Sequence, residues 1–443
     1  MEFLASDALQ GRGSGTRDEW IAATYVASQL EQYGIEPVGA DGTYIQRATT
    51  LRRKILEPPQ LKFEAAESGS TAHEVSWTHG KEMLVLFLGN ASFSGPLQKV
   101  DLTHGARPTI RKGSTVFLTA RSDADVRRVV TELASQGAAA FLIPASEQLR
   151  GHWEERAGTL PQLPAELEGV PTVDMGPGFT VVAVNPDAAE VLRDLPEGTV
   201  IHLDTNASSP EKSFTWNTIG KISGTDASQR HAAILLSAHL DHLGVGQPVN
   251  GDTIYNGADD DASGTTAVLE LARAFSSRSP GARPRPRRTL IFALFGSEET
   301  GGLGSTYFRE HPPVTLGDIV ASLEFEMIGR RDPKVPEDTL WLTGWERSNF
   351  GPALAAHGAR LVADPHPEQN FFRRSDNYVL ARKGVVAQTV SSFGLHPDYH
   401  QPSDELCRID FKHMDEAIQS MLAPIVWLAN SSFVPHWKEG GKP

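Results

Sequence analysis

The run AILLSAHLDHLG at residues 233–244 combines two features that together decide the fold. Its first half is an unbroken series of small and branched apolar residues, which is typical of a strand buried on both faces of a sheet. Its second half presents His239, Asp241 and His242 directly after the apolar residues. The run therefore predicts a buried strand that delivers two imidazoles and a carboxylate at its carboxyl end.

The pattern that begins with this strand continues through the rest of the chain. Further apolar runs occupy residues 289–295, 319–325 and 384–390, and helical segments such as 265–277 lie between them. Continuous apolar strands that alternate with helices indicate an α/β domain with a parallel-rich sheet covered on both faces. In such sheets ligands bind beyond the carboxyl ends of the strands.

Potential metal ligands gather where the predicted strands end. Three Asp lie in NGADDDASG (256–264), two Glu in FGSEETGG (295–302), two Glu in EFEMIGR (324–330) and two His in LHPDYHQPSD (395–404). Each feature alone has an ordinary explanation, because Asp residues cap helices and paired Glu residues are commonly solvated. Together they would repel one another at one sheet edge without a cation. We therefore expect a divalent metal centre.

The candidate ligands can be assigned to a site for two metals. Two metals a few ångströms apart need one bridging carboxylate and further ligands on each side, with room for water. Five residues fill that need: Asp260, His239, Glu326, Glu299 and His400. Asp241 lies two residues after His239, and we expect its carboxylate to hold the other imidazole nitrogen.

The composition argues against several classes of protein. The 443 residues include 55 acidic and 41 basic side chains, and the net charge of −14 argues against a nucleic-acid-binding surface. The single cysteine, Cys407, permits no intrachain disulfide. No apolar run approaches the ~20 residues of a membrane-spanning helix. Residues 1–16 show neither the basic nor the apolar region of a signal peptide.

The texture of the sequence divides the chain into three parts. Residues 81–205 contain short strand-like runs separated by turn-rich segments, unlike the regular alternation that follows. We therefore expect a smaller inserted domain at 81–205, an N-terminal part of the main domain at 1–80, and the main domain at 206–443. Residues 11–16, GRGSGT, superficially resemble a nucleotide-binding loop. No strand precedes them, so we interpret them as a flexible loop.

Six segments resemble motifs of the zinc exopeptidases of metallopeptidase family 28, the bacterial leucyl-aminopeptidase-like group. They are SAHLDHLG, NGADDDASG, GSEETGGLGS, EFEMIGR, RRSDNYVLARKG and LHPDYHQPSD, in the family's order. The resemblance implies an α/β fold, a three-layer zinc-exopeptidase domain with a mixed, mostly parallel sheet. Many members carry a protease-associated (PA) domain where residues 81–205 lie, which implies a smaller PA-like α+β domain there.

The resemblance also implies roles for the candidate ligands. Asp260 would bridge two zinc ions per chain. His239 and Glu326 would complete one metal site. Glu299 and His400 would complete the other. Members of the family have a cis peptide bond after the bridging residue. The sequence departs from the family pattern at Glu326, where the family usually has Asp. The side chain of Glu is longer by one methylene, which shifts the metal or the backbone.

Among the other residues, the resemblance implies Glu298 as general base, Tyr399 as a donor to the oxyanion and Arg374 as a substrate contact. The implied reaction removes the N-terminal residue from peptides with a free α-amine. A carboxypeptidase on the same scaffold stays open because Arg330, Arg373 and Arg374 could hold a carboxylate. A glutaminyl cyclase, which uses one zinc, and a non-catalytic binding protein, which would lack ligands, are the remaining alternatives. Family analogy favours a periplasmic or secreted location.

Overall fold

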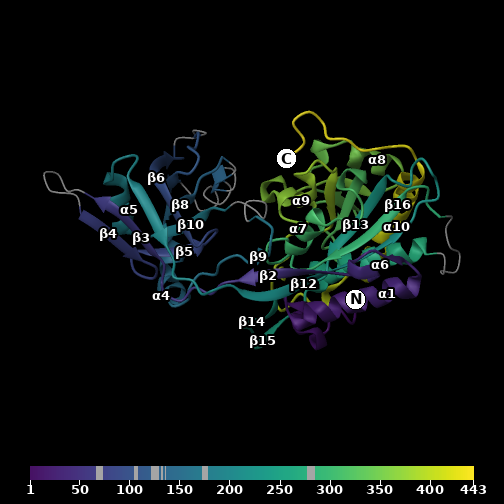
Figure 1. Cartoon of the computed structure of the whole chain (residues 1–443), viewed down its shortest axis with the longest axis horizontal. Coiled ribbons are helices and arrows are strands. Elements are labelled where there is room, and N and C mark those ends of the chain that lie inside the picture. Colours follow the sequence, from purple (N-terminus) through teal and green to yellow (C-terminus); the bar gives the residue numbers. More distant parts are fainter. Residues whose placement is uncertain are drawn as a thin grey trace. The chain divides into compact units, whose positions relative to one another are not determined.

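The computed structural model describes residues 1–65, 73–103, 108–120, 129–130, 133–134, 136–171, 178–276 and 285–443. The chain divides into two units (Figure 1), one formed by Met1–Thr50 with Ser213–Pro443 and the other by Leu51–Lys212. All the predicted metal ligands belong to the first unit. None of the described helices is both long and apolar enough to cross a bilayer.

A mixed sheet forms the centre of the first unit. Its strands are β1 (Glu36–Pro37), β2 (Ile45–Arg52), β12 (Glu211–Ile222), β13 (Ala233–His239), β16 (Thr289–Phe295), β17 (Ile319–Phe325), β18 (Leu340–Leu342), β19 (Leu361–Ala363) and β20 (Ala387–Ser391). They lie in the order β19-β18-β20-β17-β13-β16-β12-β2, and β1 pairs with β12. The central strands β20, β17, β13 and β16 run parallel, whereas β18 and β12 are antiparallel to β20 and β16.

The central strands are almost entirely buried because helices cover both faces of the sheet. The helices are α1 (Arg17–Tyr33), α6 (Gly264–Phe275), α7 (Leu303–Glu310), α8 (Phe350–Ala356), α9 (Asn377–Ala381) and α10 (Phe411–Asn430). On β13, Ile234 and Leu236 join the core under α1, α6, α8 and α10, while Leu235 joins a second core with α7 and α9. Figure 1 shows α1 and α6 together on one side of β13. The unit is the mixed α/β fold that the alternation of strands and helices predicts.

A hairpin and several short turns complete the first unit. The hairpin consists of β14 (Gly244–Val249) and β15 (Asp252–Tyr255). The turns are η1 (Asp7–Arg12), η2 (Ala40–Gly42), η4 (Ala258–Ser263), η5 (Leu316–Asp318), η6 (Trp345–Arg347), η7 (Pro367–Gln369), η8 (Phe371–Arg373) and η9 (Leu406–Arg408). Helix α1 begins after Thr16, whose hydroxyl accepts the backbone N–H groups of Asp18 and Glu19, and it ends at Gly34.

The second unit has a mixed sheet of its own. The described helices and strands of this unit are β3 (Gln60–Ala65), β4 (His73–Thr78), β5 (Met83–Phe87), β6 (Ser92–Asp101), β7 (Thr115–Thr119), β8 (Ala140–Pro144), α3 (Glu147–Gly151), α4 (Trp153–Ala157), β9 (Glu166–Leu167), β10 (Thr180–Val184), α5 (Pro186–Asp194) and β11 (Val200–Asp204). Eight of these strands form the sheet, in the order β4-β3-β11-β6-β7-β8-β10-β5. This unit starts at Leu51, whereas the sequence predicted a boundary at residue 81. The boundary differs because β3, which precedes residue 81, pairs with both β4 and β11 of this unit.

Candidate metal centre and active site

The predicted ligands meet at the carboxyl edge of the central strands. His239 is the last residue of β13, Glu326 directly follows β17, and Glu299 lies in the loop after β16. Asp260 lies in η4, just before α6, and His400 lies between β20 and η9. Because parallel strands align their carboxyl ends, these five segments come together although they are far apart in the sequence.

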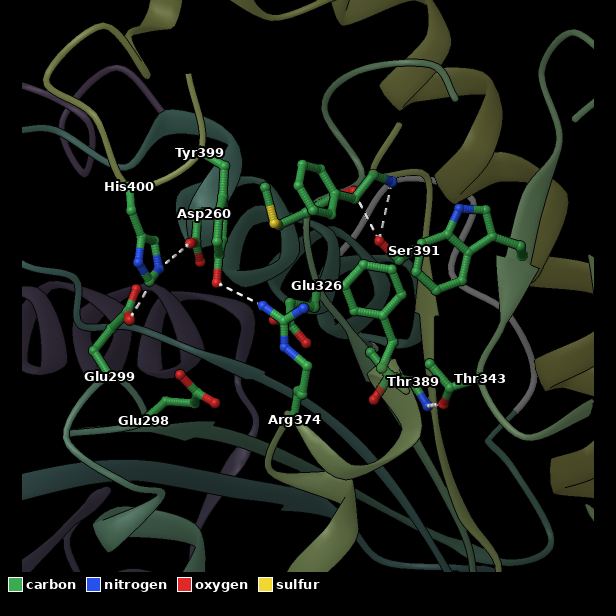
Figure 2. A pocket seen from close by; sticks show the side chains of 14 residues that line it. Asp260, Glu298, Glu299, Glu326, Thr343, Arg374, Thr389, Ser391, Tyr399 and His400 are labelled. Atoms are coloured by element: carbon green, nitrogen blue, oxygen red, sulfur yellow. Dashed lines mark hydrogen bonds and ion pairs between the residues drawn. The ribbon is translucent and has the colours of Figure 1, made fainter. Parts of the chain in front are cut away.

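The carboxylate of Asp260 lies between two groups of ligands. Its Oδ1 is 3.1 Å from His239 Nε2, and its Oδ2 is 3.2 Å from His400 Nε2. The same nitrogen of His400 is 3.2 Å from Glu299 Oε2 (Figure 2). Ligand atoms of His239, Asp260 and Glu326 all lie within 4.8 Å of one another. Asp260 thus presents one oxygen to each histidine, as a bridging ligand does.

The surroundings of the His239 imidazole indicate whether these residues fit a metal ion. The residue is 1% exposed, and its Nε2 makes no hydrogen bond to any residue that the structure describes. A buried polar atom that makes no hydrogen bond is costly, and this one faces an oxygen of the Asp260 carboxylate at 3.1 Å. Imidazole nitrogen and carboxylate oxygen together form a donor set typical of zinc. The residues therefore fit a divalent metal ion.

Crowding of buried charges shifts the pKa values of these groups. Burial raises the pKa of Glu326 to about 7, and the charge of Asp260 adds to the rise. Burial also raises the pKa of Glu298 well above its usual range. Burial opposes the charged form of His400, but hydrogen bonds with Asp260 and Glu299 outweigh it and raise the pKa of His400 to about 10. Without a metal the cluster holds protons, which a metal ion displaces on binding.

The three consecutive aspartates have different partners. Asp261 accepts hydrogen bonds from three backbone N–H groups, those of His239, Gly264 and Met327. Asp259 lies 3.0 Å from the Nε2 of His396. The helix-capping explanation therefore applies to Asp261, whereas Asp260 faces the other ligands. The peptide bond between Asp260 and Asp261 is cis.

Asp241 contacts His239, as predicted, and also a second loop. Its Oδ1 is 3.8 Å from His239 Nδ1, and that nitrogen lies closer, 3.2 Å, to the backbone carbonyl of Asp241. The carboxylate also accepts the backbone N–H groups of Glu298 at 2.9 Å and Glu299 at 3.3 Å. The local sequence around β13 does not reveal these further contacts, because the N–H donors come from the loop after β16. Asp241 therefore holds the loop that carries Glu298 and Glu299.

A cavity lies beside the predicted ligands, and three further predicted residues border it. Glu298, Tyr399 and Arg374 line it together with the ligand Asp260 (Figure 2). The Nη2 of Arg374 donates to the hydroxyl oxygen of Tyr399 at 3.2 Å, and the Tyr399 ring stacks on His400 with centroids 3.9 Å apart. Burial raises the pKa of Tyr399, so its phenol keeps the proton.

Aromatic and hydroxyl side chains and one methionine line the remainder of this cavity, and the sequence alone assigned them no role. They are Met327, Trp341, Thr343, Phe371, Thr389, Ser391 and Phe393. Phe371 stacks on Trp341 with centroids 5.4 Å apart and meets Phe393 edge to face at 5.8 Å. A cavity with aromatic side chains on one part of its wall and convergent polar groups on the other is typical of a small-ligand site.

His242 is a site residue for which the sequence alone suggested no role. It is fully buried, and its Nδ1 lies 2.8 Å from Glu299 Oε1 and 3.9 Å from Asp260 Oδ2. Its ring therefore contacts one oxygen of Glu299, while the other oxygen faces His400. The signal that could have found it is its position, one residue after Asp241 at the same strand end.

Residues 11–16 are not the flexible loop that we expected. Arg12 is 1% exposed and Ser14 is 9% exposed, and Glu19, at the start of α1, is fully buried. The expectation was wrong because partners that bury these residues, such as Leu240, Asp241 and Thr215, lie more than 190 positions away in the sequence. No local pattern of apolar residues marks such contacts.

The match to known sequences covers the part of the chain that carries the site. Residues 217–425 match the profile of peptidase family M28. Leucine aminopeptidase 1 of Metarhizium robertsii is 25% identical over 219 residues, which cover 48% of this chain and 55% of that protein. A protein of Arthroderma benhamiae named "Probable glutamate carboxypeptidase" is 31% identical over 113 residues, 25% of this chain and 14% of that protein. The chain thus spans about half the length of the first relative and less of the second.

A solved structure shares the fold of the chain. The aminopeptidase from Aneurinibacillus sp. strain AM-1 superimposes with a TM-score of 0.54 at 19% identity, covering 98% of this chain and 93% of that one. The segment that matches the family profile begins before His239 and ends after His400, so it contains every predicted ligand. The part of the chain that carries the site, residues 217–425, is therefore similar in sequence to peptidase family M28.

Proposed function

We propose that this chain is a zinc-dependent aminopeptidase that removes the N-terminal residue from peptides with a free α-amine. The observation that carries the proposal is the Asp260 carboxylate, whose two oxygens lie 3.1 Å from His239 and 3.2 Å from His400. In this proposal Asp260 would be shared by two zinc ions. His239 and Glu326 would hold one of them, and Glu299 and His400 would hold the other. Bound zinc supplies Lewis acidity, which lowers the pKa of water and polarises a carbonyl group.

Glu298 is the proposed general base. It lines the cavity beside Asp260 and Glu299, and its raised pKa favours acceptance of a proton. Its carboxylate takes a proton from the attacking water and then gives it to the leaving amine. The Tyr399 O–H donates to the oxyanion, since Arg374 donates to the phenolic oxygen and leaves the hydroxyl proton free.

The side chains around the cavity carry charges of both signs. Four carboxylates line the cavity, those of Asp260, Glu298, Glu299 and Glu326, and Arg374 is the one Lys or Arg side chain among the described residues that line it. Three of these carboxylates are proposed zinc ligands, and the charges of two zinc ions would offset them. Only Glu298 is then left to attract a cationic chain end, so the choice of an aminopeptidase follows the relative from Metarhizium robertsii.

A carboxypeptidase on the same scaffold is the second candidate. It is supported by Arg374 at the cavity and by the relative named as a glutamate carboxypeptidase. The other two predicted cations contact different groups. Arg330 pairs with Asp398 at 2.7 Å, and the guanidinium of Arg373 lies 5.8 Å from the centre of the Tyr378 ring. A single guanidinium therefore has to hold the substrate carboxylate in this alternative.

The second unit is, in this proposal, a PA-like domain inserted into the peptidase domain. The chain leaves the first unit after Thr50 and re-enters it at Ser213, which supports an insertion. The unit's sheet of parallel and antiparallel strands, with a core of its own, is consistent with an independently folded domain.

The test measures metal content and cleavage on one sample. We expect about two zinc ions per chain, in line with a two-metal hydrolase, and cleavage of aminoacyl-p-nitroanilides with a free but not an acetylated α-amine. Glu298→Gln should retain the metal and lose at least ~100-fold in kcat, as expected for a general base. Glu190→Gln, an exposed change on α5, is the control. Metal-loaded chain that cleaves only acylated dipeptides would favour the carboxypeptidase, and a chain without metal would contradict both.

A further inference from the structure

The N-terminal segment GRGSGTRDE, residues 11–19, packs against the strand end that carries His239. The backbone N–H of His242 donates to the Arg12 carbonyl at 3.1 Å, and the N–H of Ser14 donates to the His242 carbonyl at 3.2 Å. Gly11 allows this approach because its φ is +68° and an added Cβ would lie 2.4 Å from the Tyr255 carbonyl oxygen. The segment therefore runs alongside the β13 end, where its side chains reach several site loops.

Arg12 connects the loop after His239 with the segment that precedes Asp260, the proposed bridging ligand. Its guanidinium donates to four backbone carbonyls, those of Leu4, Leu240, Asn256 and Gly257. Leu240 is next to His239, and Gly257 lies three residues before Asp260. A guanidinium presents several donors in a rigid plane, so one side chain can hold both loops at a fixed spacing. Its positive charge also faces the buried aspartates, including Asp241 and Asp260.

Ser14 acts on the proposed base and on one ligand through Asp241. Its hydroxyl donates to Asp241 Oδ2 at 2.6 Å. The same carboxylate accepts the backbone N–H groups of Glu298 and Glu299. Removal of the hydroxyl takes one donor from a fully buried carboxylate, which then becomes free to shift.

Glu19 holds the loop after β16 from its other side. Its carboxyl group accepts hydrogen bonds from Ser297 Oγ at 3.0 Å, Thr215 Oγ1 at 2.6 Å and the backbone N–H of Trp216 at 3.0 Å. Ser297 immediately precedes Glu298. Thus Arg12, Ser14 and Glu19 contact three different loops, yet none of them lines the cavity beside the ligands.

We propose that residues 11–19 form a clasp that positions the metal-bearing loops, with Arg12, Ser14 and Glu19 as positioning residues. This inference rests on the proposed function, because the ligands and the base that the clasp positions are those of the proposed reaction. The contacts fix backbone atoms next to His239, Asp260, Glu298 and Glu299. Partners of this kind orient ligands and bases without contacting the substrate. The clasp would therefore affect metal affinity and turnover more than substrate binding.

The test compares Ser14→Ala with Ser14→Thr, which keeps a hydroxyl, and with Val26→Ala. Val26 is a fully buried residue of α1 outside the clasp, so its truncation lowers stability without removing a clasp contact. We measure amide hydrogen exchange of Glu298 and Glu299 in metal-free protein, Co²⁺ affinity by chelator competition, the visible spectrum of the Co²⁺ form, and kcat and KM.

We expect Ser14→Ala to exchange faster at Glu298 and Glu299 and to bind Co²⁺ roughly 10-fold more weakly, with a changed spectrum. Its kcat should fall about 10-fold with KM changed less than about 2-fold, since an orienting contact is lost. Ser14→Thr should recover most of the loss, and Val26→Ala should keep wild-type affinity and spectrum. Identical exchange, affinity and spectrum in Ser14→Ala and Val26→Ala would overturn the clasp. Because exchange and metal binding need no substrate, a wild-type chain that binds metal but cleaves nothing contradicts the proposed function alone.

Discussion

At the scale of single residues, His242 determines which oxygen of Glu299 is free to face a metal ion. The Nδ1 of His242 lies 2.8 Å from Glu299 Oε1, and Glu299 Oε2 lies 3.2 Å from His400. His242→Phe keeps an aromatic ring but removes the N–H donor, so the carboxylate can rotate. In the proposed two-zinc site, we expect the zinc ion that Glu299 and His400 would hold to bind about 10–100-fold more weakly, as for other partners of metal ligands. The zinc ion that His239 would hold should bind as before.

A titration against a chromophoric zinc chelator resolves the two binding steps and checks this expectation. His231→Phe, at an exposed position just before β13, is the control. Equal weakening of both steps would instead indicate a general loss of structure, and no weakening would show that Glu299 keeps its orientation without His242.

At the scale of elements, helix α1 buries the carboxyl group of Glu19 against the sheet. Burial, with the charge of Asp241 added, raises the pKa of Glu19 to about 8 from the value of 4.5 that applies when the chain is unfolded. The folded chain therefore binds this proton more tightly than the unfolded chain. The stability from protonated Glu19 is complete below about pH 4.5 and is lost as the pH rises through about 8.

Glu19→Gln removes the titration and should flatten this pH dependence. Between about pH 5 and 8 the free energy of unfolding of the wild type should fall by on the order of a few kcal/mol more than that of the variant. Urea unfolding of both zinc-loaded proteins across this range measures the difference. Parallel curves would mean that Glu19 is ionised throughout, and Glu190→Gln should follow the wild type.

At the scale of the whole molecule, the two units have separate hydrophobic cores, and all predicted ligands lie in the first unit. Metal that binds only the folded first unit stabilises that unit by mass action, by about 4 kcal/mol at a free concentration 1,000-fold above Kd. We expect two calorimetric transitions for the full chain. Removal of zinc with a chelator should lower the midpoint of one and leave the other in place. An equal shift of both midpoints would show that the units unfold together.

Several elements and ligands follow from short stretches of sequence. Residues 233–239 are buried at every position because helices cover both faces of β13, so the mainly apolar run marks a central strand by itself. His239 and Glu326 lie at strand ends, and the parallel arrangement of the strands places them side by side. Local patterns are sufficient there because burial and strand direction leave few alternatives.

The sequence by itself determined the mixed α/β fold and the ligand types at the strand ends, because periodic apolar runs and adjacent polar residues are local properties. Only the tertiary structure decided that Asp241 holds the loop of Glu298, that Arg12 and Glu19 are buried, and that the second unit begins at Leu51. Each of these depends on a hydrogen bond or strand pairing between distant segments. Such contacts are chosen by the burial of polar groups in the folded chain, and no local periodicity records them.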